Sequence, residues 1–177
     1  MTFDCPDEVE DQRVVTKSRK LLCNHQIDDT WFGKLFYSTV FLSLSEIIFM
    51  DSRIKYWADL SDYDLETANA MLVSKRYLYV GFMCHQSIEK IFKALYVKLK
   101  NETPPFSHSL SYLSRNGEFF ELLTEADKEF IDLLEPLNIE ARYPSDKERL
   151  FKSLTSEKCS EIMQNTRKLQ QWIKKKL

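Results

Sequence analysis

Five polar side chains near the middle of the chain have the types and spacing of an ion-pairing or phosphate-binding surface. They are His85, Gln86, Glu89, Lys90 and Lys93, and they alternate with apolar residues spaced three and four apart. On a helix they fall on a flank opposite the apolar stripe, with Glu89 and Lys93 placed for an i,i+4 ion pair. Because lysine contacts phosphate well but is also common on surfaces, we interpret this flank as a solvated face, a dimer-cleft surface or a nucleotide-phosphate site.

A metal site at the same place is not favoured. His85 and Glu89 stand one helical turn apart and could share an ion. Even with Cys84, which lies in the apolar stripe, they supply fewer ligands than the usual tetrahedral zinc site requires. The four cysteines are widely spaced and form no CxxC pair, which indicates reduced thiols. We therefore expect no metal and no cofactor.

Two further places carry residues that could contact a ligand. Arg142 and Tyr143 precede a proline that restricts Tyr143 to extended geometry and so fixes the turn. The Arg142 guanidinium is interpreted as a bidentate phosphate contact or as the partner of Glu89 or Asp146 in a salt bridge. Tyr143 is interpreted as a base-stacking or a packing residue. His108 precedes an apolar helix start, where a capping or packing role is favoured over that of a base.

The elements that position these side chains are expected to be helices. The 177 residues include only 3 glycines and 5 prolines, too few for the many reversals of a β-sandwich or barrel. The formal net charge of -2 gives no overall attraction to nucleic acid, so RNA binding is neither indicated nor excluded. Apolar stripes at helical spacing must be buried against one another. The predicted fold is all-α, an antiparallel up-and-down bundle of about five helices.

Capping residues, glycines and prolines predict where these helices begin and end. The signals give a first helix within residues 51–80, a second from Val80 to before Pro104, a third after His108 that stops at Gly117, a fourth from a Thr124–Asp127 capping box to before Pro136, and a fifth from a Ser145–Glu148 capping box to the lysine-rich end.

The first 49 residues differ from the rest, and we expect an N-terminal extension at 1–49 and a helical domain at 50–177. Residues 1–12 are acidic, the wrong sign for a signal peptide or a mitochondrial presequence, so a cytoplasmic location is expected. Residues 31–50 are apolar, but their uncharged run covers only 35–45, whereas a spanning helix needs about 20 residues. This stretch is interpreted as a helix packed on the domain or on a second copy rather than a membrane segment, or as an extension of little consequence.

Four motifs, in order, resemble the HEPN domain family. Residues 56–60 (YWADL) and 63–68 (YDLETA) look like the family's opening helix. Residues 82–95 (FMCHQSIEKIFKAL) are similar to its Gln–x–x–Glu–Lys–x–x–Lys–Ala core. Residues 103–110 (TPPFSHSL) resemble its Thr–His–Asp–Leu entry to the third helix, and residues 141–144 (ARYP) its Arg–Tyr–Pro turn. The resemblance covers residues 50 to about 173.

The resemblance implies a homodimer formed through long helices and a nucleotide-binding or partner-binding role, with a nucleotidyltransferase in a toxin–antitoxin-like pair. It also implies a rival, because some HEPN proteins are metal-independent ribonucleases with an Arg followed after four to six residues by His. Here only Arg19 and His25 have that spacing, outside the resembling region. We therefore expect a binding protein rather than an enzyme. The alternatives are a ribonuclease with a non-standard set around Arg142 and His85 or His108, and a structural homodimer without a ligand.

Overall fold

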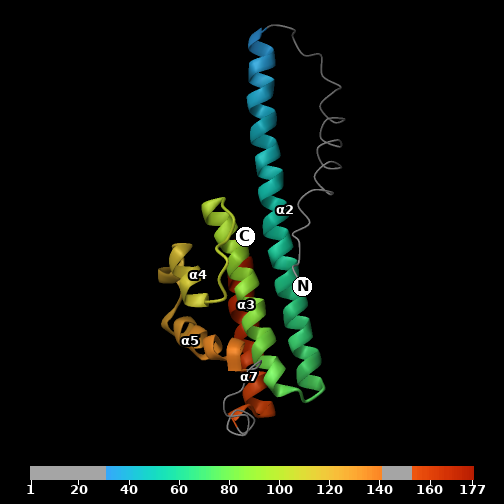
Figure 1. Ribbon diagram of the computed structural model, residues 1–177, viewed down its shortest axis with the longest axis vertical. Coiled ribbons are helices and arrows are strands. Elements are labelled where there is room, and N and C mark those ends of the chain that lie inside the picture. Colours follow the sequence, from blue (N-terminus) through green and yellow to red (C-terminus); the bar gives the residue numbers. More distant parts are fainter. Residues whose placement is uncertain (1–30, 141–152) are drawn as a thin grey trace. The chain divides into compact units, whose positions relative to one another are not determined.

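The computed structural model describes residues 31–140 and 153–177, with side chains from residue 49 to 138 and from 153 onward. The chain divides into two units, Met1–Phe49 and Met50–Leu177, and the contacts described below belong to the second. Within the described residues every regular element is helical, so the all-α prediction is confirmed (Figure 1). The elements are α2 (Trp31–Val73), α3 (Tyr77–Lys100), α4 (Leu110–Asn116), a short 3₁₀ helix η1 (Phe120–Leu122), α5 (Glu125–Glu140) and α7 (Ser156–Lys174).

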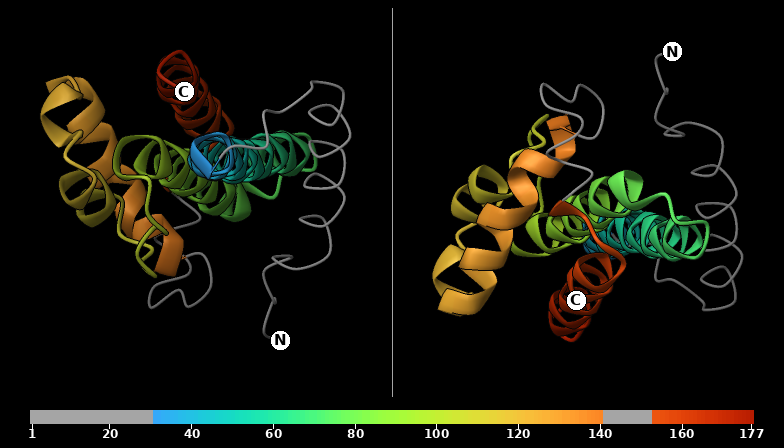
Figure 2. Two further views of the ribbon diagram at one scale, coloured as in Figure 1. Left: turned by 90° about the horizontal axis from the view of Figure 1, so that it is seen from above. Right: turned by 90° about the horizontal axis from the view of Figure 1, so that it is seen from below.

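Helix α3 lies at the centre of the bundle. It packs against α7, α5 and α4, and Figure 2 shows it between the α4–α5 pair and α7. Because neighbours cover it on several sides, it is buried around most of its circumference, as expected for a central helix. Each large apolar side chain removed from water in this way stabilises the fold by about 1.5–3 kcal/mol. Its fully buried apolar residues are Val80, Cys84, Ile88, Ile91, Phe92, Ala94, Leu95 and Val97.

The turn between the first two helices was not predicted. Helix α2 ends at Val73 rather than continuing to residue 80, and α3 begins at Tyr77. Lys75 takes a left-handed conformation with φ 57°, and the Arg76 amide donates to the Met71 carbonyl at 2.8 Å, a helix-ending bond. Left-handed ends usually carry glycine, so a lysine there leaves no signal in the sequence.

The ends of the next two helices follow their predicted signals. Helix α3 stops at Lys100, where Asn101 takes a left-handed conformation with φ 52° ahead of the two prolines. Helix α4 stops at Gly117, as expected. Its N-cap is Ser109, whose side chain accepts a hydrogen bond from the Tyr112 amide. His108 is therefore not the capping residue.

Helix α5 begins as predicted but extends further. The Thr124 amide donates to Asp127 Oδ2 at 3.1 Å, and the Asp127 amide donates to Thr124 Oγ1 at 3.2 Å, which is a capping box. The predicted end before Pro136 is wrong, because the helix continues to Glu140. Pro136 is exposed, so the backbone carbonyl that it leaves without an intrahelical donor can reach water, and buried Leu134 and Leu137 on either side anchor the helix.

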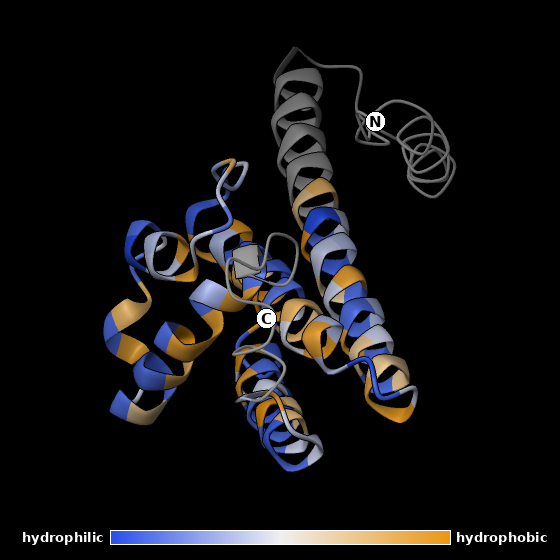
Figure 3. Cartoon of the chain, turned by 60° about the horizontal axis from the view of Figure 1, so that its bottom comes forward, coloured by the Kyte–Doolittle hydropathy of each residue, from blue (hydrophilic) through white to orange (hydrophobic). Residues whose placement is uncertain are grey.

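Helix α7 begins at Ser156, with Thr155 as its N-cap accepting from the Lys158 amide at 3.2 Å. The predicted capping box at Ser145 and Glu148 lies outside the described residues. The helix is strongly amphipathic, and Figure 3 shows hydrophobic and hydrophilic residues on its different sides. Its buried face, which packs on α3, consists of Cys159, Ile162, Met163, Thr166, Leu169, Gln170 and Ile173.

Candidate functional site

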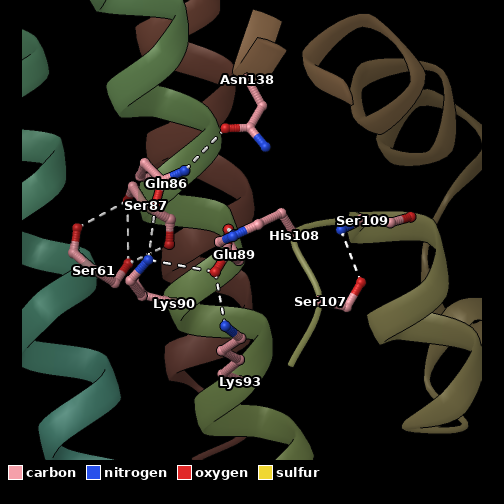
Figure 4. Close-up of polar contacts among 10 residues, drawn as sticks. All are labelled: Ser61, Gln86, Ser87, Glu89, Lys90, Lys93, Ser107, His108, Ser109 and Asn138. Atoms are coloured by element: carbon pink, nitrogen blue, oxygen red, sulfur yellow. Dashed lines mark hydrogen bonds and ion pairs between the residues drawn. The ribbon is translucent and has the colours of Figure 1, made fainter. Parts of the chain in front are cut away.

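The carboxylate of Glu89 is the centre of a polar cluster on α3. Glu89 is fully buried, and its Oε1 accepts from Lys93 Nζ at 2.8 Å and faces Lys90 Nζ at 3.4 Å. Its Oε2 is 2.9 Å from His108 Nδ1 (Figure 4). Burial alone would raise the pKa of Glu89, but the Lys90 charge and the contacts with Lys93 and His108 outweigh it and lower the pKa. Glu89 is therefore an ionised carboxylate inside the protein.

The two lysines are held differently. Lys93 is buried, bonds Glu89 and lies 5.1 Å from the centre of the Trp57 ring on α2. Lys90 instead donates to Gln86 Oε1 at 2.9 Å, and Gln86 Nε2 donates to Asn138 Oδ1 on α5 at 3.3 Å. The shortest contact of Lys90 is thus to a neutral amide, and its side chain is more exposed, at 17% against 10% for Lys93. Lys90 is the cation of the cluster that an incoming anion can reach more easily.

A second carboxylate lies close to this cluster. Burial raises the pKa of Asp64 on α2, the nearby Lys90 lowers it, and Glu89 raises it. Two lysines thus face two carboxylates, so the cluster is close to neutral when His108 is uncharged. The sign of the net charge of the cluster therefore depends on His108 and on any group that Lys90 binds.

A solvated face, one of the three interpretations of this flank, does not describe the position of His85. The residue is fully buried, and neither ring nitrogen has a hydrogen-bond partner among the described residues. Burial lowers the pKa of His85 to about 4, so the ring is neutral near pH 7. The interpretation of this flank as a solvated face is also wrong for Glu89 and Lys93, because both residues are buried. The predicted Glu89–Lys93 ion pair is nevertheless present.

His108 is the member of the cluster that reaches the surface. Its side chain is 55% exposed, and Figure 4 shows it extending from the segment before α4 toward Glu89. An ionised carboxylate only accepts hydrogen bonds, so Nδ1 of His108 must carry the proton in this contact. The opposite nitrogen, Nε2, is left for the solvent side. His108 thus has a larger part in the site than the capping or packing role predicted for it.

Phe106 stands beside His108 and was not singled out in the sequence. Its side chain is fully exposed, with a relative accessibility of 103%, and its ring centre is 6.2 Å from that of His108. The backbone around it is held by hydrogen bonds: the Ser107 amide donates to the Pro105 carbonyl at 2.8 Å, and the Ser109 amide to Ser107 Oγ at 3.1 Å. An aromatic after two prolines gives no indication in sequence of which way its ring points.

A second polar network joins three helices and was also missed. Ser61 of α2 and Ser87 of α3 each donate to the other's carbonyl, at 2.8 and 2.9 Å, and Gln170 of α7 donates to Ser61 Oγ at 2.8 Å. Lys174, at the lysine-rich end of α7, is 2.5 Å from Asp62 Oδ1. Because these groups satisfy one another, the network positions α2, α3 and α7 and offers no open group to a ligand.

The structure therefore brings five of the seven candidate residues together on α3, namely His85, Gln86, Glu89, Lys90 and Lys93. Arg142 and Tyr143 lie outside the described residues, as does the Arg19–His25 pair. Among the described side chains, no group of three or more His, Cys, Asp or Glu could hold a metal ion. No helix in the described part of the chain is long and apolar enough to cross a membrane.

Comparison with known proteins identifies the class that this fold and site define. The family model of the HEPN domain matches residues 54–177, so the chain belongs to the HEPN domain family. Among solved structures, TT1696 from Thermus thermophilus is 20% identical with a TM-score of 0.61, over 71% of this chain and 98% of that one. ST0689, an archaeal HEPN homologue, is 22% identical with a TM-score of 0.53, over 70% of this chain and 96% of that one. No curated protein matches the chain significantly. At these identities the structures show a shared fold.

Proposed function

We propose that this HEPN protein is a cytoplasmic nucleotide-binding or partner-binding module that works with a nucleotidyltransferase in a toxin–antitoxin-like pair. The observation that carries the proposal is the buried, ionised Glu89 with Lys90, Lys93 and His108 gathered around it. Replacing a buried ion pair with apolar residues is often neutral or stabilising, so folding alone gives little reason for such a cluster. Perturbed titratable groups gathered in one place favour a functional site.

Lys90 is the phosphate contact in this proposal. A phosphate oxygen that replaces the Gln86 amide as its acceptor gives the Lys90 ammonium an ionised partner in place of a neutral one. Lys93 stays on Glu89 and keeps the carboxylate compensated while Lys90 turns outward. The two lysines would therefore have different roles: Lys90 binds the phosphate, and Lys93 stabilises the Glu89 carboxylate.

The pairing with a nucleotidyltransferase rests on membership of the HEPN family, whose members are found beside such enzymes. It is tested by co-expressing the chain with a nucleotidyltransferase encoded in the neighbouring reading frame and purifying through a tag on one of them. Stable co-elution supports the pairing. Separate elution at micromolar concentrations of both proteins contradicts it.

A homodimer is the second part of the proposal, and the exposed face of α2 supports it. Tyr56 and Tyr63 lie on one side of this helix and are 40% and 68% exposed. They are seven residues apart, the spacing at which side chains line the seam between two packed helices. Aromatic side chains are enriched in protein interfaces relative to the rest of the surface. A second copy of α2 is the partner that this tyrosine pair fits.

A panel of nucleotides tests the binding function. The full chain is melted with ATP, ADP, AMP, GTP, CTP or UTP, since a ligand that binds only the native state raises the melting temperature by mass action. A saturable rise with at least one of them supports the proposal. The absence of any rise at millimolar nucleotide contradicts nucleotide binding and favours the structural homodimer.

His108 also supports a second candidate, the metal-independent ribonuclease with a non-standard active site. A histidine oriented by a buried carboxylate through Nδ1, with Nε2 toward solvent, has the geometry of a general base. His85 cannot take that part, because both of its nitrogens are buried. The test is cleavage of labelled RNA in EDTA by the wild type and by His108→Ala. Cleavage that the variant lacks would establish the enzyme, and equal or absent cleavage would exclude it.

A further inference from the structure

We propose that the segment 101–109 between α3 and α4 is the recognition element for the nucleotide, with Phe106 stacking on the base and His108 bonding a phosphate oxygen through Nε2. This inference deepens the proposed nucleotide binding and rests on it. It assigns the contacts with the base and the phosphate to two residues that do not lie on α3. It also makes binding depend on a proton at Nε2 of His108.

The presentation of Phe106 is the first observation. An apolar ring that is fully exposed gains nothing from the hydrophobic effect in the folded chain. Its backbone is nevertheless held, by the two prolines before it and by the hydrogen bonds of Ser107 and Ser109. A rigid, exposed aromatic loses little conformational freedom when it binds, and every nucleobase offers a face on which it can stack.

The orientation of His108 is the second observation. Glu89 fixes the ring through Nδ1, so that Nε2 is the nitrogen available to a ligand beside Phe106. In the uncharged ring that nitrogen has only a lone pair, which repels a phosphate oxygen. When it is protonated it donates to the oxygen while Nδ1 keeps its bond to Glu89. A phosphate can therefore bind at Nε2 only together with a proton.

The charged groups around the ring come from three helices. The groups that face the ring or its carboxylate are Glu89, Lys90, Lys93 and His85 from α3, Asp64 from α2 and Glu135 from α5. His85 is neutral, and the two lysines are matched by Asp64 and Glu89. With Glu135 nearby and a bound phosphate added, the charge around the ring is negative.

Calorimetry on the full-length protein tests the inference with ATP, GTP, adenosine and inorganic pyrophosphate as probes. Titrations at one pH in buffers of different ionisation enthalpy report the protons taken up on binding. The wild type is expected to take up a fraction of a proton with each triphosphate and with pyrophosphate, and none with adenosine. Binding of the triphosphates is expected to weaken as the pH rises.

Two variants separate the two contacts. Asparagine at residue 108 still offers an N–H to Glu89 but has no outer nitrogen, so His108→Asn is expected to bind triphosphate about tenfold more weakly and without proton uptake. Phe106→Ala is expected to weaken triphosphate binding by roughly 5- to 150-fold while leaving pyrophosphate unchanged. Tyr79→Ala, which removes a half-exposed aromatic at the start of α3, is the control and should bind like the wild type.

Circular dichroism melting shows whether the variants remain folded. If the wild type binds a triphosphate and both folded variants bind it equally well, or if no proton is taken up, the recognition element is wrong and nucleotide binding stands. If the wild type binds neither triphosphate nor any other nucleotide of the melting panel, the recognition element and the proposed nucleotide binding both fail.

Discussion

At the scale of single residues, His85 is the side chain that most clearly lowers the free energy of unfolding. Its two buried nitrogens have no hydrogen-bond partner in the part of the chain that the structure describes, and an unsatisfied polar group in the interior costs about 1–3 kcal/mol. Protonating the ring inside the protein is costlier still, as the fall of its pKa to about 4 reflects. This residue therefore makes the stability of the protein sensitive to acid.

We predict that the free energy of unfolding falls as the pH is lowered from 6.5 to 4 because of His85. In that interval the unfolded chain takes up a proton on this ring while the folded chain does not, so acid favours unfolding. The shift of the pKa from 6.5 to about 4 corresponds to roughly 3 kcal/mol over the whole interval. Above pH 6.5 the effect is absent.

Urea unfolding of the wild type and of His85→Leu at pH 7 and pH 4.5 measures this effect. The variant removes both unsatisfied nitrogens, so it should be at least as stable as the wild type at pH 7 and lose less stability on acidification. Equal losses of stability in the two proteins would show that His85 is not the acid-sensitive group.

The sequence predicted the Glu89–Lys93 ion pair of the polar cluster but not the burial of these residues. Spacing alone identifies the Glu89–Lys93 pair, since residues four apart on a helix are neighbours whatever surrounds them. Spacing does not tell that Glu89 and Lys93 are buried, because burial depends on contacts with segments distant in sequence. The parts played by His108 and Phe106 depend in the same way on where a connecting segment runs.

At the scale of elements, the Thr124–Asp127 cap and the proline pair after α3 were reliable signals of helix ends, and Pro136 was a misleading one. The Thr124–Asp127 box marks the start of α5, because it satisfies amide groups that the first helical turn leaves without partners. Pro136 did not end the same helix, since packing of buried Leu134 and Leu137 compensates for the lost hydrogen bond. The left-handed Lys75 shows the converse case, a helix end with no sequence signal.

We predict that Thr124→Ala lowers the free energy of unfolding by about 0.5–2 kcal/mol, because it removes the acceptor of the Asp127 amide. Thr67→Ala is the matched control. The Thr67 hydroxyl donates to the Tyr63 carbonyl in the interior of α2 and caps no helix end. Chemical denaturation of both variants gives the comparison. A loss in the control as large as that in Thr124→Ala would mean that the cap does not stabilise α5.

At the scale of the whole molecule, the fold class followed from composition and periodicity, since few glycines and several apolar stripes leave a helical bundle as the simplest way to bury them. Four ordered motifs were enough to indicate the HEPN family, which the family model over residues 54–177 confirms. The proposed homodimer and the division into an extension at 1–49 and a domain at 50–177 stay predictions.

The proposed dimer predicts that Tyr63→Glu weakens self-association by roughly tenfold or more, because it places a charge within the tyrosine pair of α2. Tyr112→Glu makes the same change at a half-exposed tyrosine of α4 and should leave association unchanged. Sedimentation velocity over a range of concentrations measures both. A wild type that stays monomeric at high concentration, or equal association in all three proteins, would rule out this interface.

The central claim is that the α3 cluster binds the phosphate of a nucleotide through Lys90, and nucleotide titration calorimetry of a matched pair of variants tests it most directly. Lys90→Gln removes the cation of the cluster, whereas Lys55→Gln removes an exposed lysine paired with Asp59 on α2. We expect Lys90→Gln to bind about tenfold or more weakly than the wild type, and Lys55→Gln to bind like it. Unchanged affinity in a folded Lys90→Gln protein would contradict the claim.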